Sequence, residues 1–201
     1  MKFLNKWRSR LLVSCVGMLI FWSFTVSRTA EAAADRHSLG LQIGQVILMG
    51  DYGSRVNNGI GVGVLYDYEA SDLFGLMVEA SYSGHSNNND TNSLGLLGLV
   101  PNLKVNMLYL DKLTFFGLAG FGLYRVDQTI ENVSGSVLTF GFDLGAGFHL
   151  DVGENFLFGS TLLFYNIFNR VDSATVSTAN PSGFSMGGTM LKLGVFGAYV
   201  F

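Results

Sequence analysis

The clearest pattern in the chain is a strict alternation of apolar residues with small or polar ones. Between positions 138 and 150 every even position is apolar and every odd position is small or polar. A period of two predicts a β-strand with two unlike faces. The run exceeds the average of about five or six residues for a strand and matches the roughly 9–11 residues that a tilted strand needs to cross a bilayer. We therefore predict a transmembrane strand whose apolar face contacts lipid.

The same alternation recurs along the chain and predicts about eight strands. They begin near Ser38, Ile60, Phe74, Leu97, Leu113, Leu138, Phe156 and Thr189. Pro101 lies inside one of them and predicts a bulge or an unpaired amide, because proline cannot donate to a sheet ladder. Both parities of 113–124 contain Phe and Gly, so the sequence leaves the facing of that strand open.

The breaks between these strands alternate between short and long. The short breaks are 70–72, 111–112 and 151–155, and the long polar ones are 51–58, 84–92, 125–135 and 169–185. An even strand number with short periplasmic turns and long external loops is typical of bacterial outer membrane barrels. The pattern predicts an eight-stranded antiparallel transmembrane β-barrel with both termini in the periplasm.

Elimination also favours a barrel. In lipid every backbone amide must be paired, so a spanning chain is either helical or a closed sheet. After position 34 no segment offers about 18 uncharged apolar residues in a row, because even 94–110 contains Pro101 and Lys104. The soluble alternative is a lipocalin-like barrel. A charged fraction of 13%, about half that of a typical soluble domain, opposes it.

The first 34 residues have the pattern of a secretory signal peptide. Four basic residues precede an apolar run, and small residues follow at 30–34. We predict a signal peptide over 1–34, cleaved after Ala32 or Ala34, and a barrel domain over 35–201; a retained anchor is the alternative. The residues around Cys15 resemble a lipoprotein cleavage box, but cleavage there would leave an apolar 17–24 on the mature chain.

Without residues 1–34 the chain has no cysteine and is acidic. Lys and Arg fall from 12 to 7 and Asp and Glu from 15 to 14, which gives a net charge of about −7 with neutral histidines. The absence of cysteine excludes disulfide and thiol chemistry in the mature chain. The acidic balance argues against nucleic acid as a partner.

The last strand carries the most specific resemblance. Terminal Phe201 is preceded at alternate positions by Tyr199, Val195 and Leu193, although Gly197 departs from the apolar series. Over residues 38–201 the topology resembles the small outer membrane β-barrel family typified by the transmembrane domain of outer membrane protein A. The resemblance implies a Gram-negative outer membrane, with its lipids as surroundings. It also implies recognition of the last strand by the barrel assembly machinery.

The few charges inside predicted strands all take the lumen-facing parity. They are Asp67, Glu69, Glu79, Lys104, Asp143 and Lys192. The last four of these lie roughly six to nine residues from the short breaks, so we expect them at a similar height. The lumen of an eight-stranded barrel is only wide enough to be filled by side chains. Two interpretations remain open: Glu79, Lys104, Asp143 and Lys192 form a paired plug, or lumen water solvates each separately.

Candidate chemistry is sparse. His85 and Ser86 suggest a lipid-modifying enzyme, but catalysis needs a base aimed at the hydroxyl and a group orienting the base. We interpret His85 as a solvated loop residue. Three scattered histidines give no metal-ligand spacing, and we expect neither a cofactor nor a metal. Aromatic residues cluster at the predicted strand ends, as in the interfacial girdles that contact lipid.

The sequence therefore predicts a non-enzymatic outer membrane barrel. The favoured role is structural or interactive, in which the loops 51–58, 84–92, 125–135 and 169–185 contact a surface ligand. A narrow channel for ions or small solutes is the first alternative, and a lipid-modifying enzyme the second.

Overall fold

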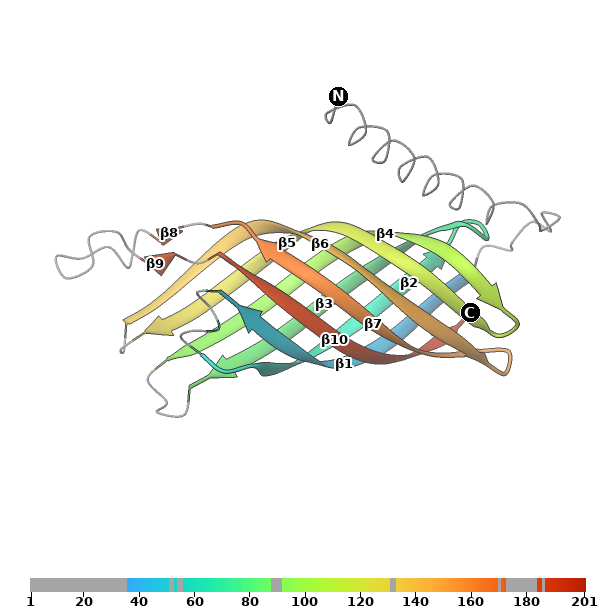
Figure 1. The fold of residues 1–201 in the computed structure, drawn as a ribbon, viewed down its shortest axis with the longest axis horizontal. Helices are drawn as coiled ribbons and strands as arrows, with labels where there is room; N and C mark the ends of the chain where they lie inside the picture. The colour runs from blue at the N-terminus through green and yellow to red at the C-terminus, as the bar shows by residue number, and fades with distance from the viewer. Residues whose placement is uncertain are drawn as a thin grey trace, which may run out of the picture. The chain divides into compact units, whose positions relative to one another are not determined.

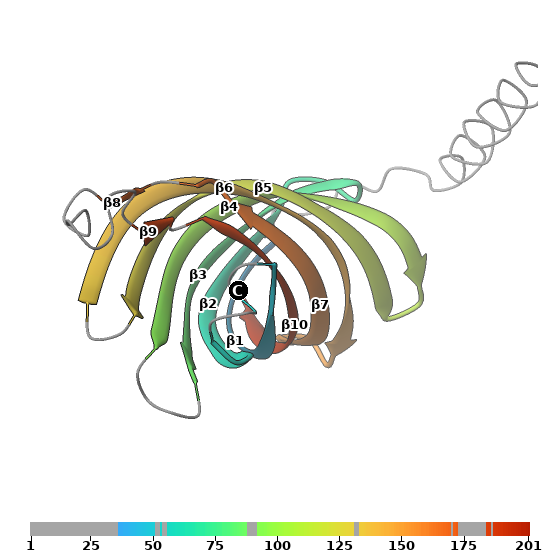
Figure 2. The same cartoon turned by 60° about the vertical axis from the view of Figure 1, so that its left-hand side comes forward.

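Eight long strands form a closed antiparallel barrel in the computed structural model of the chain (Figure 1). They are β1 (Arg36–Met49), β2 (Gly59–Glu69), β3 (Phe74–Ser86), β4 (Ser93–Leu110), β5 (Leu113–Ile130), β6 (Val133–Val152), β7 (Phe156–Ile167) and β10 (Gly188–Val200). Strands that follow one another in this series are hydrogen-bonded neighbours, and β1 pairs with β10 to close the ring (Figure 2). A separate two-stranded sheet joins β8 (Val171–Asp172) to β9 (Phe184–Ser185). The predicted eight-stranded antiparallel barrel is confirmed.

The structure describes residues 36–50, 53, 56–87, 92–130, 133–169, 171–172, 184–185 and 187–201. The predicted signal peptide, its cleavage sites after Ala32 and Ala34, and Cys15 lie outside these residues. Among the described residues there is no helix long and apolar enough to cross a membrane.

The two ends of the barrel differ. The short connections at 70–73, 111–112 and 153–155 share one end with Arg36 and Phe201, and we call it the turn end. The connections at 50–58, 87–92, 131–132 and 168–187 lie at the opposite end, which we call the loop end.

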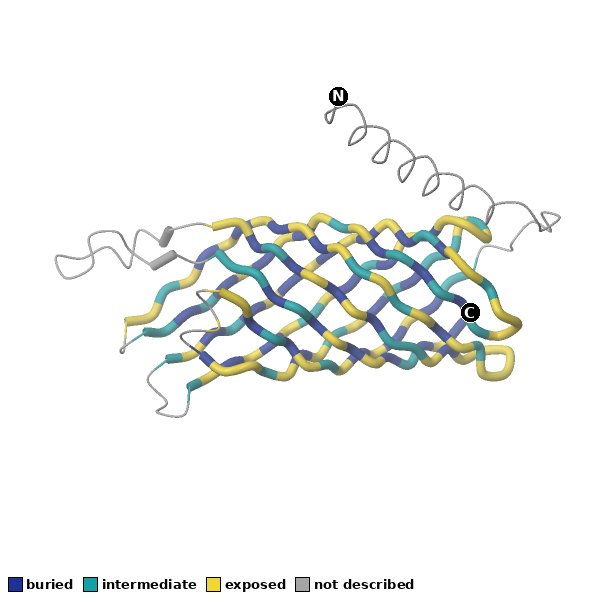
Figure 3. The backbone as a smooth tube through the Cα atoms, in the orientation of Figure 1, coloured by how far each residue is buried: buried dark blue, intermediate teal, exposed yellow. Residues whose placement is uncertain are grey.

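Buried and exposed residues alternate along every barrel strand (Figure 3). On β6 the even-numbered apolar residues such as Leu138 and Phe140 are exposed, whereas Thr139 and Asp143 are buried. The structure settles the facing of 113–124: Phe116 and the other even-numbered residues face the lumen. The barrel therefore presents an apolar surface outward and buries its polar residues, as expected for a protein whose solvent is lipid.

Two of the predicted loops are shorter in the structure than the sequence predicts. Residues 125–130 and 133–135 belong to strands and not to a loop, because β5 and β6 stay paired until Ile130 meets Val133. In the same way β3 continues to Ser86, which pairs with Ser93, so the connection after β3 is 87–92 and not 84–92. Polar residues at these positions suggested loops, but backbone pairing does not need an apolar face once the strands have left the membrane.

Pro101 lies on the outer face of β4 and leaves the register of the sheet unchanged. The pairs Leu99 with Leu123 and Asn102 with Gly120 belong to one register, and the ladder to β5 omits Val100 and Pro101. The register shift in this pair of strands lies instead between Asn106 and Leu108.

Candidate functional site

The predicted lumen charges all point inward and are almost completely buried. The exposed fraction is 0% for Lys104 on β4, 1% for Glu79 on β3, 2% for Asp143 on β6 and 3% for Lys192 on β10. Each occupies the inward parity of its strand, since alternate residues of a strand face the same side of a sheet. Charges in such an interior are costly unless they are paired and hydrogen-bonded. Their partners therefore determine what the lumen can do.

A first group of contacts crosses the middle of the barrel. Lys192 Nζ donates to Glu79 Oε1 at 2.5 Å and to Gln42 Oε1 at 2.7 Å. The Tyr165 hydroxyl lies 3.3 Å from both Glu79 oxygens, and Gln42 Nε2 donates to Thr161 Oγ1 at 2.6 Å. These contacts tie β1, β3, β7 and β10 together through the lumen. We call the ion pair of Lys192 with Glu79 at their centre the central pair.

A second group lies nearer the turn end. Lys104 Nζ donates to Asp67 Oδ2 at 2.5 Å and to Glu69 Oε1 at 2.9 Å. The same ammonium group lies 5.0 Å from the centre of the Phe116 ring, within the range of a cation–π contact. Arg36 forms an ion pair with Asp151 and lies 3.7 Å from Glu69. We call this group the lower ion cluster.

Asp143 stands apart from both groups. Within the part of the chain that the structure describes, neither of its carboxylate oxygens has a hydrogen-bond partner, and Asn102 Oδ1 has none either. Both side chains occupy the space that a Cβ atom on Gly120 would need, which places the carboxylate next to the amide. Position 120 therefore requires glycine, because the side chains of Asn102 and Asp143 occupy the space of a Cβ atom.

The structure thus divides the predicted cluster of Glu79, Lys104, Asp143 and Lys192. It brings Glu79 and Lys192 together, places Lys104 with Asp67 and Glu69, and leaves Asp143 without a cationic partner in contact. The prediction of one common height fails because the strands are staggered. Phe74 at the start of β3 pairs with Val105, so β4 continues to Leu110, beyond the first residue of β3, at the turn end. Asp67 and Glu69 have the correct parity in the sequence, but their height could not be read from it.

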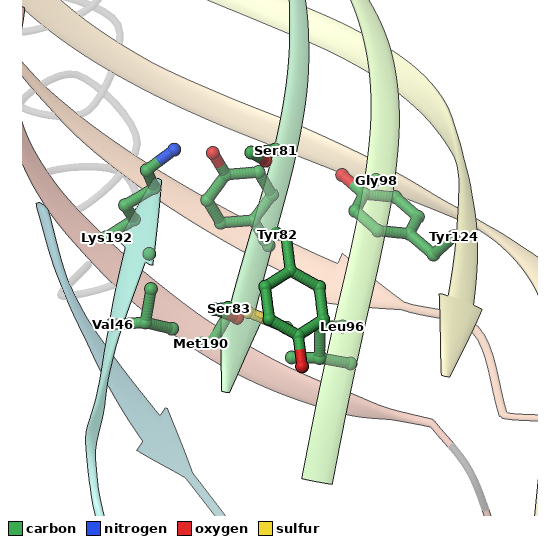
Figure 4. A pocket seen from close by; sticks show the side chains of 11 residues that line it. Val46, Ser81, Tyr82, Ser83, Leu96, Gly98, Tyr124, Met190 and Lys192 are labelled. Atoms are coloured by element: carbon green, nitrogen blue, oxygen red, sulfur yellow. The ribbon is translucent and has the colours of Figure 1, made fainter. Parts of the chain in front are cut away.

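The lumen is filled on the loop side of the central pair. A cavity of about 30 Å³ lies there, lined by residues that include Val46, Ser83, Leu96, Tyr124 and Lys192. Figure 4 shows Lys192 and Tyr124 entering this space from opposite sides. One ordered water needs about 10–15 Å³ by this measure, so the cavity holds two or three waters at most. Leu94, Val126 and Ile167 belong to one buried apolar cluster with Val46 and Leu96.

His85 is not the solvated loop residue that we predicted. It lies on β3 and is buried, with Nε2 at 3.1 Å from Ser83 Oγ and Nδ1 at 3.2 Å from the Asn57 carbonyl oxygen. It contacts Ser83 and not Ser86, because residues two apart share a strand face. This contact places an imidazole beside a hydroxyl. Ser83 is itself buried and borders the cavity of about 30 Å³, whereas His85 also borders a larger hollow near the loop end.

The other two histidines lie near the turn end. His37 stacks on the Tyr66 and Tyr68 rings, and the ring of His149 lies 5.7 Å from that of Phe116. Among the described residues no three His, Cys, Asp or Glu side chains gather into a group that could hold a metal ion.

The predicted assembly residues all lie on the outer face of the barrel. Leu193, Val195, Tyr199 and Phe201 are exposed there. Gly197 lies in the same row, and a Cβ atom placed on it would be 3.2 Å from the Phe158 ring. The ring of the neighbouring strand therefore covers the glycine, which accounts for its departure from the apolar series. The role of these residues in assembly stays a prediction.

Comparison with known proteins gives a family and a fold. The sequence profile of the family described as outer membrane protein beta-barrel domain matches residues 16–195. Neisserial surface protein A is 10% identical with a TM-score of 0.58, over 84% of this chain and 97% of that one. Ail, the attachment invasion locus protein of Yersinia pestis, is 14% identical with a TM-score of 0.54, over 83% and 99%. OprG from Pseudomonas aeruginosa is 14% identical with a TM-score of 0.52, over 86% and 98%. The search of curated proteins found no match.

Proposed function

We propose, from the premise that this chain belongs to the outer membrane protein β-barrel family, that it is a closed barrel with a structural or surface-interaction role. The filled lumen carries the proposal. Glu79, Lys192 and Tyr165 meet across the interior, and the cavity beside them measures only about 30 Å³. An eight-stranded barrel is wide enough for side chains but leaves no aqueous channel when they fill it. We infer that solutes do not pass.

The energy of the central pair supports a lumen that stays closed. A conducting path would have to separate Lys192 from Glu79 while both remain away from bulk water. Losing one partner of a buried ion pair costs about 3–5 kcal/mol. Since about 1.4 kcal/mol corresponds to a factor of ten, a state with the pair broken would hold roughly one molecule in a hundred or fewer.

We propose that the loop end faces the cell exterior and the turn end faces the periplasm. Short periplasmic turns and longer external connections are the usual arrangement in this class of barrel. Arg36 and Phe201 would then both lie on the periplasmic side. The connections at 50–58, 87–92, 131–132 and 168–187 would be presented to the surroundings of the cell.

The names of two similar structures favour a surface role. One is called a Neisserial surface protein and the other an attachment invasion locus protein. Ail has also been solved in complex with a heparin analogue, sucrose octasulfate. We do not propose a polyanionic ligand here, because Arg125, an exposed base near the loop end, is engaged by Asp127 at 3.1 Å.

We propose no enzymatic reaction. The imidazole of His85 and the hydroxyl of Ser83 are within hydrogen-bond distance, but both are buried inside the barrel. The other ring nitrogen of His85, Nδ1, contacts the Asn57 carbonyl oxygen, so both nitrogens are already engaged within the protein.

Single-channel conductance tests the closed lumen. Folded wild-type protein should be silent in a planar bilayer, after heat-modifiable gel migration has verified folding. The double variant Glu79→Ser/Lys192→Ser removes both charged side chains of the central pair without changing the net charge. Discrete steps from this variant would place the barrier at the central pair, and silence would place it in the buried apolar cluster that includes Leu94 and Val126. The matched control Ala80→Ser/Leu193→Ala alters the adjacent outward positions and should stay silent. Discrete steps from folded wild-type protein would establish a channel instead.

Cysteine labelling tests the orientation. In a Cys15→Ser background, a membrane-impermeant maleimide added to intact cells should label Ser134→Cys at the loop end. It should label Lys112→Cys at the turn end only after the outer membrane has been permeabilised. Both positions are exposed, so a difference in labelling reports sidedness and not burial. The opposite result would show that the loop end faces the periplasm.

A further inference from the structure

The outer face of the barrel is hollowed near the loop end, over β3, β4, β5 and β6. The hollow has a volume of about 470 Å³, within the range of small-molecule sites. Register places one row of outward-facing residues across its floor: Gly84, Gly95, Asp127 and Ser136. The two glycines leave backbone where side chains would otherwise project.

The walls of the hollow are polar and carry one aromatic ring. The next row towards the loop end consists of Ser86, Ser93, Thr129 and Ser134, and all of these except Ser86 line the hollow. Thr129 Oγ1 lies 2.9 Å from Ser134 Oγ. On the turn-end side of the floor the Tyr82 side chain extends over Gly95. A Cβ atom on Gly95 would lie 3.5 Å from the Tyr82 hydroxyl. The site therefore offers hydroxyls, a carboxylate and a ring.

The position of the hollow relates it to the membrane. The row immediately below it consists of Tyr82, Leu97, Arg125 and Leu138. Leu97 and Leu138 are both 51% exposed and mark the edge of the apolar outer surface. A molecule seated in the hollow would hold its polar part there and could lay an acyl chain along the leucines. The outward residues change here from apolar to polar, as expected where lipid headgroups begin.

The chemistry of the hollow suits a neutral polyol better than a phosphate. Hydroxyl and carboxylate groups exchange hydrogen bonds with sugar hydroxyls, and the ring of Tyr82 offers an apolar face for stacking. Among the described residues, Arg125 is a cation in the row beside the hollow, and it already donates to Asp127 Oδ1. We propose that this hollow binds the saccharide headgroup of a glycolipid in the outer leaflet of the membrane.

The glycines allow a variant that fills the hollow without disturbing the fold. A Cβ atom on Gly84 or Gly95 would meet nothing closer than 3.7 Å or 3.5 Å respectively, which is ordinary contact. Gly84→Val and Gly95→Val add a β-branched side chain that suits a strand. Ala80→Val is the matched control, because it adds bulk to an exposed outward position of the same strand below the hollow.

The experiment compares protein purified from membranes and placed in lipid nanodiscs. Discs contain phosphatidylcholine with either a neutral glycolipid, diglucosyl diacylglycerol, or phosphatidylglycerol, and retained lipid is measured by native mass spectrometry. We expect wild type and Ala80→Val to retain the neutral glycolipid. Gly84→Val and Gly95→Val should retain at least tenfold less while still folding by heat-modifiable migration.

Three outcomes would overturn the proposal. Equal retention of the neutral glycolipid by the valine variants would show that the hollow is not the site. Preference of wild type for phosphatidylglycerol would show that charge and not sugar is recognised. Binding of the free oligosaccharide as tightly as the intact glycolipid would show that the acyl chain has no part. The conductance test of the closed lumen is independent of all three.

Discussion

Removing one charge of the central pair should destabilise the barrel by an amount that depends on which charge is removed. Lys192→Met leaves two buried carboxylates, Glu79 and Asp143, without a cation in contact, since Lys104 is held by Asp67 and Glu69. Glu79→Gln leaves Lys192 with the Gln42 carbonyl oxygen and with electrostatic attraction to Asp143. The lysine variant should therefore be the less stable of the two.

The magnitudes follow from the burial of the pair. Both side chains are almost fully buried, and losing one partner of such a pair costs about 3–5 kcal/mol. We expect that loss for Lys192→Met. For Glu79→Gln we expect about 1–3 kcal/mol, the cost of a weakened buried hydrogen bond. The double variant should be more stable than Lys192→Met alone, because it leaves neither charge of the pair uncompensated. The interaction energy should then exceed the loss for Glu79→Gln, and so be at least about 1 kcal/mol.

Equilibrium unfolding in urea measures these differences. The folded fraction in detergent micelles is scored by heat-modifiable migration, and the four free energies of unfolding form a double-mutant cycle. Leu193→Met, an outward substitution on the same strand, is the control and should match wild type. If the two single losses add in the double variant, the two residues are not coupled and the reasoning is refuted. Equal losses for the two single variants would contradict the role given to Asp143.

Three further predictions follow from burial in the lumen and exposure to lipid. Asp143→Asn should raise the free energy of unfolding by about 1–3 kcal/mol, because it replaces a buried carboxylate whose oxygens have no hydrogen-bond partner among the described residues; a lower urea midpoint would contradict this. Leu163→Ala, inside the barrel, should cost about 2–5 kcal/mol, whereas Leu162→Ala on the lipid face should cost clearly less in the same titration. Phe201→Ser should reduce the amount of barrel assembled in cells, measured in outer membrane fractions, while refolding in detergent stays normal.

The sequence predicts the strands of this barrel well because lipid imposes a simple rule. Outward positions of a spanning strand favour apolar residues, so a period of two is visible in β6 without any knowledge of its neighbours. The rule stops where the strands leave the membrane. Residues 125–135 lack an apolar face and were predicted as loop, yet β5 and β6 continue to pair through them. The facing of β5 also needed its neighbours, since Phe and Gly occupy both parities.

The candidate site was less predictable, because its geometry depends on stagger between strands. Parity alone correctly placed Glu79, Lys104, Asp143 and Lys192 in the lumen. Their heights depend on how far each strand is shifted along its neighbour, and the alternating pattern is the same after any shift of two residues. The contact of His85 with Ser83 was missed for a related reason, since the end of β3 was read as loop.

The alternating pattern does not distinguish registers that differ by two residues, and this suggests why a closed barrel keeps charges in its interior. A slip of two residues between β10 and its neighbours would preserve the apolar outer face and so would cost little in the membrane. The same slip would move Lys192 along the barrel by about 6.6 Å, at about 3.3 Å per residue. That displacement breaks the contacts of Lys192 with Glu79 and Gln42 and leaves buried charges without partners. The loss of one such partner costs about 3–5 kcal/mol. The lower ion cluster imposes a similar condition on β4 and β2 through Lys104 and Asp67. The apolar pattern therefore selects which face of each strand meets lipid, and the lumen charges select the register in which the strands close.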